Sequence, residues 1–293
     1  MEFIFLGTGT SAGLPCIDCI TAPLERKMCK MCLSVLTPEG KRNMKRNTSA
    51  VVRIHIKEGG KVTIVIDAGK AFQMSALKWF PKYGLREIDA ILITHSHADT
   101  WTLYRLIRSR INIYLLQKTF WALVSKECAS GGGDVLEFKW HIISDQTPFE
   151  VNDTGIHITP FSDHLHSSRS FTLPDEVPSQ VLECKAFLSF RFKISTACLH
   201  LRHITHPQGI LERGHIPMIR ATRTYLTGFC HAATYKEYVS MGEIVGGVLE
   251  DQREMAALDA KGFSVEKGDV IWIRPSHDGL RVMVDDGVVW DET

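Results

Sequence analysis

One stretch decides the fold, and it reads Ala90-Ile91-Leu92-Ile93-Thr94-His95-Ser96-His97-Ala98-Asp99. Four apolar residues run directly into a polar cluster, with no turn residue between them. This pattern predicts a buried strand whose carboxyl end opens on a loop. Ligands of layered α/β folds bind at such strand ends.

The polar cluster has the donors of a metal site. His95 and His97 are two residues apart on a short loop, and Asp99 adds an oxygen donor. Imidazole together with carboxylate suits zinc, iron or manganese, with coordination positions left for water. The alternative is a strand followed by a polar turn that contains histidine by chance. Ionisable side chains directly after a buried strand are costly without a partner, which favours the metal site.

This stretch resembles the H-x-H-x-D-H signature of the metallo-β-lactamase superfamily, whose members are hydrolases with a dinuclear metal site. The resemblance implies that His95, His97 and Asp99 bind metal. The last histidine of the signature falls on Thr100.

The composition is ordinary for a soluble globular protein. The chain has 293 residues, of which 44% are hydrophobic and 23% are charged, and its net charge is +1. It therefore has no strong overall field that would attract nucleic acid or an anionic membrane. The first six residues lack a basic n-region, and no apolar run approaches the ~18 residues of a membrane span. We expect a cytoplasmic protein with no membrane partner, and nucleic acid is disfavoured as a ligand.

Four of the eight cysteines form two C-x-x-C pairs, Cys16 with Cys19 and Cys29 with Cys32. Paired C-x-x-C units favour tetrahedral zinc, and without a secretion signal we prefer metal ligation to disulfides. The alternative is four free cysteines in a loop.

The cysteine segment follows Gly13-Leu14-Pro15 and resembles the bacterial phosphodiesterase branch that cleaves cyclic ribose phosphates. In that branch three cysteines and one distant histidine hold a structural zinc. The resemblance implies Cys19, Cys29, Cys32 and His231 as the zinc ligands. Cys16 is then surplus, or an alternative ligand.

The remaining family ligands are only partly present. His164, which follows a strand and Pro160, takes the place of the next catalytic metal ligand, and His166 is a possible substitute. The family's bridging aspartate has no counterpart, because residues 184–211 contain no Asp or Glu. Gly228 stands where the branch has another catalytic histidine. We therefore expect the site to hold at most one metal firmly.

Other segments support the same fold. A hairpin over residues 50–66 ends in Asp67, which by resemblance supports the metal loop without binding metal. Helical spacing predicts a helix over residues 71–80, ending before Pro81. Residues 138–143, 149–151 and 156–159 are predicted to be strands of a second sheet. The basic run at residues 41–46 is interpreted as a solvated loop, with a phosphate contact as the alternative.

The resemblance extends from Glu2 to about Trp290 and predicts an α/β fold, a four-layer αββα metallo-β-lactamase sandwich. We expect a single domain over residues 1–293, with a cysteine zinc knuckle inserted at about residues 16–32. The predicted function is metal-dependent hydrolysis of a small or cyclic phosphodiester. Asp99 and His164 are the catalytic candidates, and Zn²⁺ is the expected metal, with Mn²⁺ possible at the active site. The alternatives are a catalytically impaired protein with a binding or scaffold role and, less favoured, a tRNA-processing nuclease. The oligomeric state is not predicted.

Overall fold

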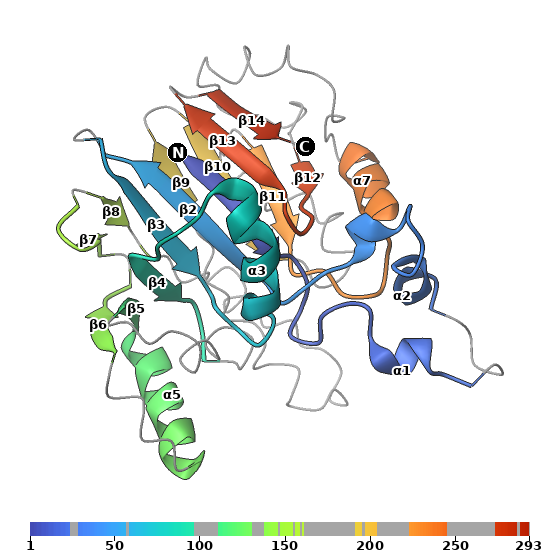
Figure 1. Cartoon of the computed structure of the whole chain (residues 1–293), viewed down its shortest axis with the longest axis horizontal. Helices are drawn as coiled ribbons and strands as arrows, with labels where there is room; N and C mark the ends of the chain where they lie inside the picture. The colour runs from blue at the N-terminus through green and yellow to red at the C-terminus, as the bar shows by residue number, and fades with distance from the viewer. Residues whose placement is uncertain are drawn as a thin grey trace, which may run out of the picture.

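The structure is a computed structural model of the chain (Figure 1). It describes residues 1–23, 29–56, 59–96, 111–130, 138–145, 147–154, 156–158, 160, 191–194, 197–203, 223–244, 273–285 and 288–292. Three predicted site residues, His97, Asp99 and His164, lie outside these ranges, as do Thr100 and His166.

The larger sheet has eight strands in the order β14-β13-β1-β2-β3-β4-β5-β6. Its bounds in chain order are β1 Glu2–Gly7, β2 Ser49–His55, β3 Lys61–Ile66, β4 Ala90–Ile93, β5 Asn112–Leu116, β6 Lys139–Ile143, β13 Arg281–Asp285 and β14 Val288–Glu292. Strands β3 to β6 pair in parallel, whereas β1 pairs antiparallel with both β2 and β13. The carboxyl ends of β1, β3 and β4 therefore lie along one edge of this sheet.

The smaller sheet has four strands in the order β12-β11-β10-β9. Its bounds are β9 Arg191–Ile194, β10 Ala197–His203, β11 Arg223–Thr227 and β12 Ile273–Pro275. Strands β7 (Phe149–Glu150) and β8 (His157–Ile158) form a separate two-stranded sheet. The assignment of residues 138–143 to the second sheet was wrong. After the α-helix of residues 117–130 the chain returns parallel to β5 and extends the first sheet, as βαβ connections do.

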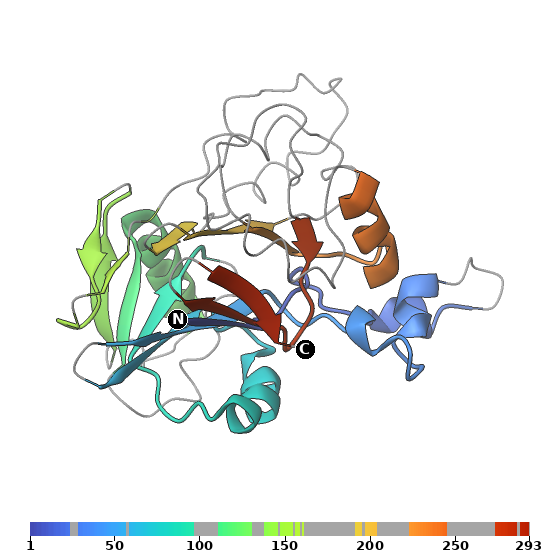
Figure 2. The ribbon, with the colours of Figure 1, turned by 90° about the horizontal axis from the view of Figure 1, so that it is seen from above.

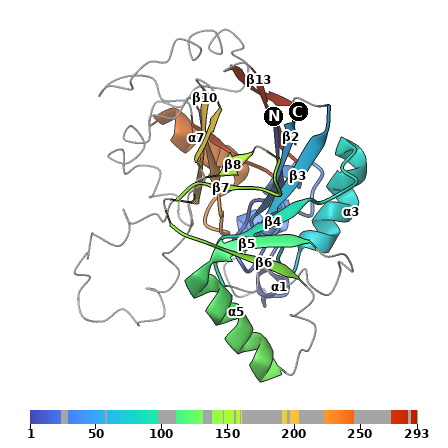
Figure 3. The same ribbon diagram turned by 90° about the vertical axis from the view of Figure 1, so that its left-hand side faces the viewer.

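The bounds of the helices are α1 Ile17–Ile20, α2 Lys30–Ser34, α3 Phe72–Tyr83, α5 Gln117–Ser130 and α7 Tyr235–Ile244, with a 3-10 helix η1 over Lys41–Asn43. Helices α3 and α5 pack on the larger sheet and α7 packs on the smaller one, whereas the short helices α1, α2 and η1 pack on one another. Helix α3 packs on the larger sheet at β1, whereas α7 packs against β12 of the smaller sheet. Figure 3, which faces the β6 edge, shows α5 beside β5 and β6.

Two apolar cores hold these layers together. One lies between the sheets and joins Phe5 and Ile64 of the larger sheet to Tyr225 of the smaller one. The other lies between the larger sheet and its helices and joins Ile91 to Trp79 and Leu123. Figure 2 shows the two sheets stacked, with α3 on the outer side of the larger one. The arrangement is the predicted αββα sandwich. None of the helices described is long and apolar enough to cross a membrane.

Helix α3 runs past Pro81 to Tyr83, three residues beyond the predicted end. It closes with a Schellman motif at Gly84, whose φ is +62°: the N–H of Gly84 donates to Pro81 O, and that of Leu85 donates to Phe80 O. Proline removes one backbone donor, but the glycine cap and the burial of Leu85 fix the end of the helix further on.

Candidate metal centres

His95 lies where the central strand β4 leaves the core. All four residues of β4 are buried, as is Thr94, and His95 itself is half-buried. The sequence therefore predicted this strand and its polar end correctly. Thr8, Asp67 and His95 follow β1, β3 and β4, so all three lie at the same edge of the larger sheet.

A chain of hydrogen bonds links Asp67 to His95 through Thr94. The Thr94 N–H donates to Asp67 Oδ1 at 2.8 Å, and the Thr94 hydroxyl donates to Asp67 Oδ2 at 2.7 Å. The same hydroxyl oxygen lies 2.6 Å from His95 Nδ1. Because a hydroxyl has one proton and gives it to the carboxylate, it accepts at His95. Nδ1 therefore carries the imidazole proton, and Nε2 carries the lone pair that a metal needs.

Asp67 is itself fixed in an unusual backbone conformation. Its φ is +55°, in the left-handed region, which aspartate tolerates better than most residues. Its N–H donates to Leu92 O at 2.9 Å, and its carbonyl accepts the Ser49 hydroxyl at 2.6 Å. The carboxylate is thus held between β2 and β4, with Thr94 as its partner.

Of the family ligands that this chain lacks, only the one replaced by Gly228 falls within the residues that the structure describes. It follows β11 with a φ of +79°, and its N–H donates to Thr8 O at 2.9 Å. The end of β11 therefore reaches the edge that carries His95. Glycine has no side chain to bind metal, so this position contributes backbone contacts only.

The two C-x-x-C pairs occupy equivalent positions, each at the start of a short helix. Cys16 and Cys29 are the residues before helices α1 and α2, and both have extended backbones. Cys19 and Cys32 lie within those helices, which pack against each other. We call residues 16–32 the cysteine knuckle; residues 24–28 within it are not described.

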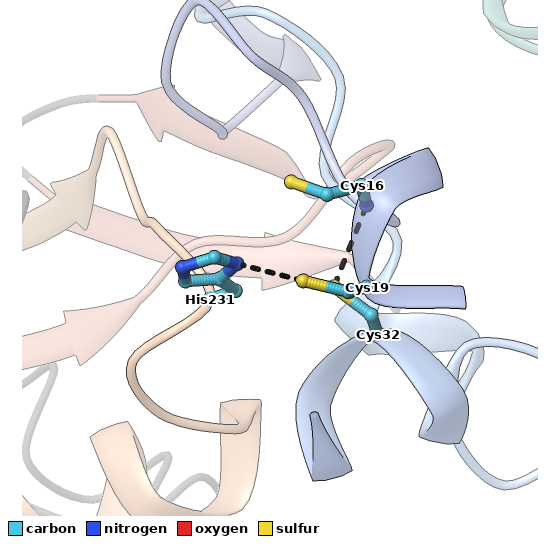
Figure 4. A group of neighbouring side chains, drawn as sticks. All are labelled: Cys16, Cys19, Cys32 and His231. Carbon is cyan, nitrogen blue, oxygen red and sulfur yellow. Dashed lines mark hydrogen bonds between the residues drawn. The ribbon is translucent and has the colours of Figure 1, made fainter. Parts of the chain in front are cut away.

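Three of the knuckle's cysteines converge with a residue from far along the chain. The ligand atoms of Cys16, Cys19, Cys32 and His231 all lie within 4.8 Å of one another. Figure 4 shows the His231 ring facing the Cys19 sulfur, and Nδ1 lies 3.4 Å from that sulfur. A tetrahedral zinc with bonds of about 2.1 Å to nitrogen and 2.3 Å to sulfur places these atoms about 3.6 Å apart. The donors and their spacing fit zinc.

Three of the four predicted zinc ligands, Cys19, Cys32 and His231, are in this group, and Cys16 is the fourth member. Cys29 lies beside it, and its thiol interacts with those of Cys19 and Cys32. Burial raises the pKa of the Cys32 thiol to about 12, and the thiols of Cys29 and Cys19 contribute to the rise. The group therefore needs a cation if its thiols are to be thiolates together.

His231 connects the knuckle to the edge that carries His95. It lies two residues after Phe229, whose N–H donates to Thr8 O and whose carbonyl accepts the Thr10 N–H. A metal bound by His231 and the cysteines would therefore tie the knuckle to the loop that follows β1.

The basic run at residues 41–46 is not the wholly solvated loop that the sequence suggested. Lys45 is fully buried, and its ammonium lies 4.2 Å from the centre of the Phe229 ring. Burial lowers the pKa of Lys45 to about 8, and nearby Asp278 opposes that change. Asp278 accepts N–H groups from Thr8 and Arg46. Lys41 and Arg42 are exposed, as predicted.

Comparison with known proteins agrees with this fold. A family model described as "Beta-lactamase superfamily domain" matches residues 62–197. The structure is similar to that of a diphosphatase from the PhnP family, with a TM-score of 0.57 and 18% identity over 98% of this chain and 99% of that one. It is also similar to Zn²⁺-bound PqqB from Methylobacterium extorquens, with a TM-score of 0.58 and 14% identity over 97% and 100%. For the metallo-β-lactamase fold protein YhfI from Bacillus subtilis, the TM-score is 0.53 and the identity 10% over 96% and 98%.

The chain therefore has the metallo-β-lactamase fold. More particularly, residues 62–197, which contain β4 and His95, match the model of the β-lactamase superfamily domain. A curated relative, an octanoyltransferase from Porphyromonas gingivalis, is 33% identical over 99 residues, which are 34% of this chain. This chain covers only 16% of the length of that protein.

Proposed function

We propose that this protein is a metal-dependent hydrolase that cleaves a small phosphodiester. The observation that carries the proposal is the Asp67–Thr94–His95 chain of hydrogen bonds at the end of β4. Such a chain fixes the tautomer and orientation of a metal-binding histidine, and a histidine on an ordinary turn has no need of it.

The proposed site is completed by residues outside the described ranges. His95, His97 and His164 would hold the metal, and Asp99 would orient the attacking water or bind a second metal. A bound divalent metal lowers the pKa of water and polarises a phosphoryl oxygen. The role of Asp67 and Thr94 is to keep the proton on Nδ1 of His95, so that Nε2 is available as a ligand.

The choice of a phosphodiester rests on two kinds of support. The sequence resembles a phosphodiesterase branch in the cysteine segment that follows Gly13-Leu14-Pro15. One solved structure of similar fold is that of a diphosphatase. Both support hydrolysis at a phosphoryl group, and the sequence resemblance favours a diester over an anhydride.

The knuckle would carry a structural zinc. Its donors link residues 16–32 to His231, across more than 200 positions of the chain. Replacing both Cys29 and Cys32 with serine should remove one zinc and lower the melting temperature. If that double variant keeps all its zinc, the structural-zinc proposal is wrong.

A chromogenic bis-aryl phosphate, assayed with added Mn²⁺ or Zn²⁺, is the test of the function. The wild type should show metal-stimulated hydrolysis that His95→Ala and His97→Ala abolish. His55→Ala is the matched control, because His55 lies at the end of β2 with its side chain 55% exposed, and its rate should be that of the wild type. Equal rates in the wild type and His97→Ala would show that the reaction is not run at this site.

An impaired protein with a binding role is the second candidate. Thr100 and Gly228 favour it, because neither supplies the imidazole of the family ligand that it replaces. This candidate predicts metal binding that depends on His95 and His97 but no hydrolysis of a phosphodiester. A tRNA-processing nuclease would instead cleave precursor tRNA in the same assay series.

A further inference from the structure

The knuckle and His231 together offer five donors for a metal that takes four. Cys16, Cys19, Cys32 and His231 form one converging group, and the Cys29 thiol interacts with two of its members. Structural zinc sites are almost always four-coordinate. One donor is therefore left over whichever set binds.

The donors fall into two groups: two lie within helices α1 and α2, and three lie outside them. Cys32 is fully buried, and its sulfur accepts the N–H of Cys16 at 3.4 Å. Cys19 lies within interaction range of all the other donors, three cysteines and His231. Cys32 is fixed by its burial within α2, and Cys19 is the donor that contacts all the others.

Cys16, Cys29 and His231 are differently placed. Cys16 and Cys29 precede their helices, outside the helical turns, and both are only partly buried. His231 is exposed and comes from the segment after β11, outside the knuckle. Figure 4 shows Cys16 and His231 approaching Cys19 from different elements. Each of these three side chains can leave the group without opening a buried cavity.

We propose that Cys19 and Cys32 hold the knuckle zinc permanently, and that Cys16, Cys29 and His231 exchange over the two remaining positions. With His231 bound, the metal ties the knuckle to the segment that contacts Thr8 and Thr10 at the His95 edge. With all four cysteines bound, the knuckle keeps its metal and that tie is released. His231 can therefore leave the metal, because the fifth donor, a cysteine, takes its place.

The test counts zinc in single and double variants, in a His95→Ala/His97→Ala background so that the count does not depend on the active site. Cys16→Ser, Cys29→Ser and His231→Ala each leave four donors, so each should retain the parent's knuckle zinc. Cys19→Ser and the double variant Cys16→Ser/Cys29→Ser should lose it. Cys230→Ser is the control, because Cys230 is next to His231 but outside the group.

Substitution of cobalt for zinc gives a second reading that does not depend on stoichiometry. The thiolate-to-cobalt absorption should strengthen in His231→Ala, because a fourth thiolate replaces the imidazole. It should not strengthen in Cys29→Ser, which keeps the imidazole and at most three thiolates. Loss of metal in Cys29→Ser or His231→Ala, with no effect of Cys16→Ser, would overturn the proposal and establish a fixed set of Cys19, Cys29, Cys32 and His231. Retention of metal in Cys19→Ser would overturn it as well.

Discussion

Thr94 donates both its backbone N–H and its hydroxyl proton to the carboxylate of Asp67, at 2.8 Å and 2.7 Å. The two residues follow neighbouring parallel strands, so the sheet itself brings them together. Since the hydroxyl also lies 2.6 Å from His95 Nδ1, its loss should affect the histidine more than the fold.

We therefore expect Thr94→Val to weaken metal binding at the His95 site by about 10- to 100-fold, the usual effect of removing a partner of a metal-binding histidine. Valine keeps the shape of threonine but cannot accept the Nδ1 proton. The measurement is competition with a chromophoric chelator in a chain without knuckle cysteines. Thr63→Val is the matched control, because Thr63 is equally buried near the other end of β3. Similar affinities in the two variants would show that Thr94 does not orient His95.

Replacing Gly279 with alanine should destabilise the protein through a steric clash that can be measured separately from the backbone strain. Its φ is +85°, and a Cβ there would lie 2.1 Å from the Trp79 ring of α3. Gly59 has a similar φ of +89°, but a Cβ there would meet nothing within 4 Å. Gly59→Ala should cost about 1 kcal/mol of unfolding free energy for the backbone alone, and Gly279→Ala about 1–3 kcal/mol more for the clash. Urea denaturation of both variants measures the difference, and equal losses would mean that α3 does not pack on the β12–β13 turn as described.

The ionisation of Glu2 makes the free energy of unfolding depend on pH in the acid range. Burial by itself would raise the pKa of Glu2, but hydrogen bonds from Arg53 and Arg281 outweigh it and lower the pKa to about 2. Since the folded pKa lies below the unfolded value of 4.5, the stabilisation is complete above pH 4.5. It should be lost as the pH falls from about 4.5 through 2.

The corresponding variant is Glu2→Gln, which should lose about 2 kcal/mol at neutral pH, because hydrogen bonds to charged groups contribute about 1.5–3 kcal/mol. Its unfolding free energy should also vary less between pH 5 and pH 3 than that of the wild type. The exposed Glu87 provides the control variant, Glu87→Gln. A steeper pH dependence in Glu2→Gln would contradict this account.

The sequence predicted the layers and most of the strands because apolar runs and the superfamily signature are local features. It did not place residues 138–143 in the correct sheet, since sheet membership depends on which strand the chain returns to. The extension of α3 past Pro81 depends on the cap at Gly84. The burial of Lys45 beneath Phe229 depends on residues that are far apart in the chain.

The candidate sites also depend on contacts between residues that are far apart in the chain, which local sequence patterns do not show. C-x-x-C spacing indicated a zinc knuckle, and the resemblance supplied His231, which no local pattern would have found. The convergence of Cys16 with that group follows from two short helices that place their cysteines alike. Thr94 stood in the signature stretch, but its role appears only when β3 brings Asp67 beside it.

The central claim is that His95 and His97 hold a catalytic metal, and metal content tests it most directly. Elemental analysis of Cys29→Ser/Cys32→Ser isolates the active site, and we expect one tightly bound metal per chain. Adding His95→Ala and His97→Ala to that background should reduce the count to none, whereas adding His55→Ala and His141→Ala should leave it at one. An unchanged count after the loss of His95 and His97 would contradict the account. Two tightly bound metals in the background chain would contradict the expectation of a site that holds only one.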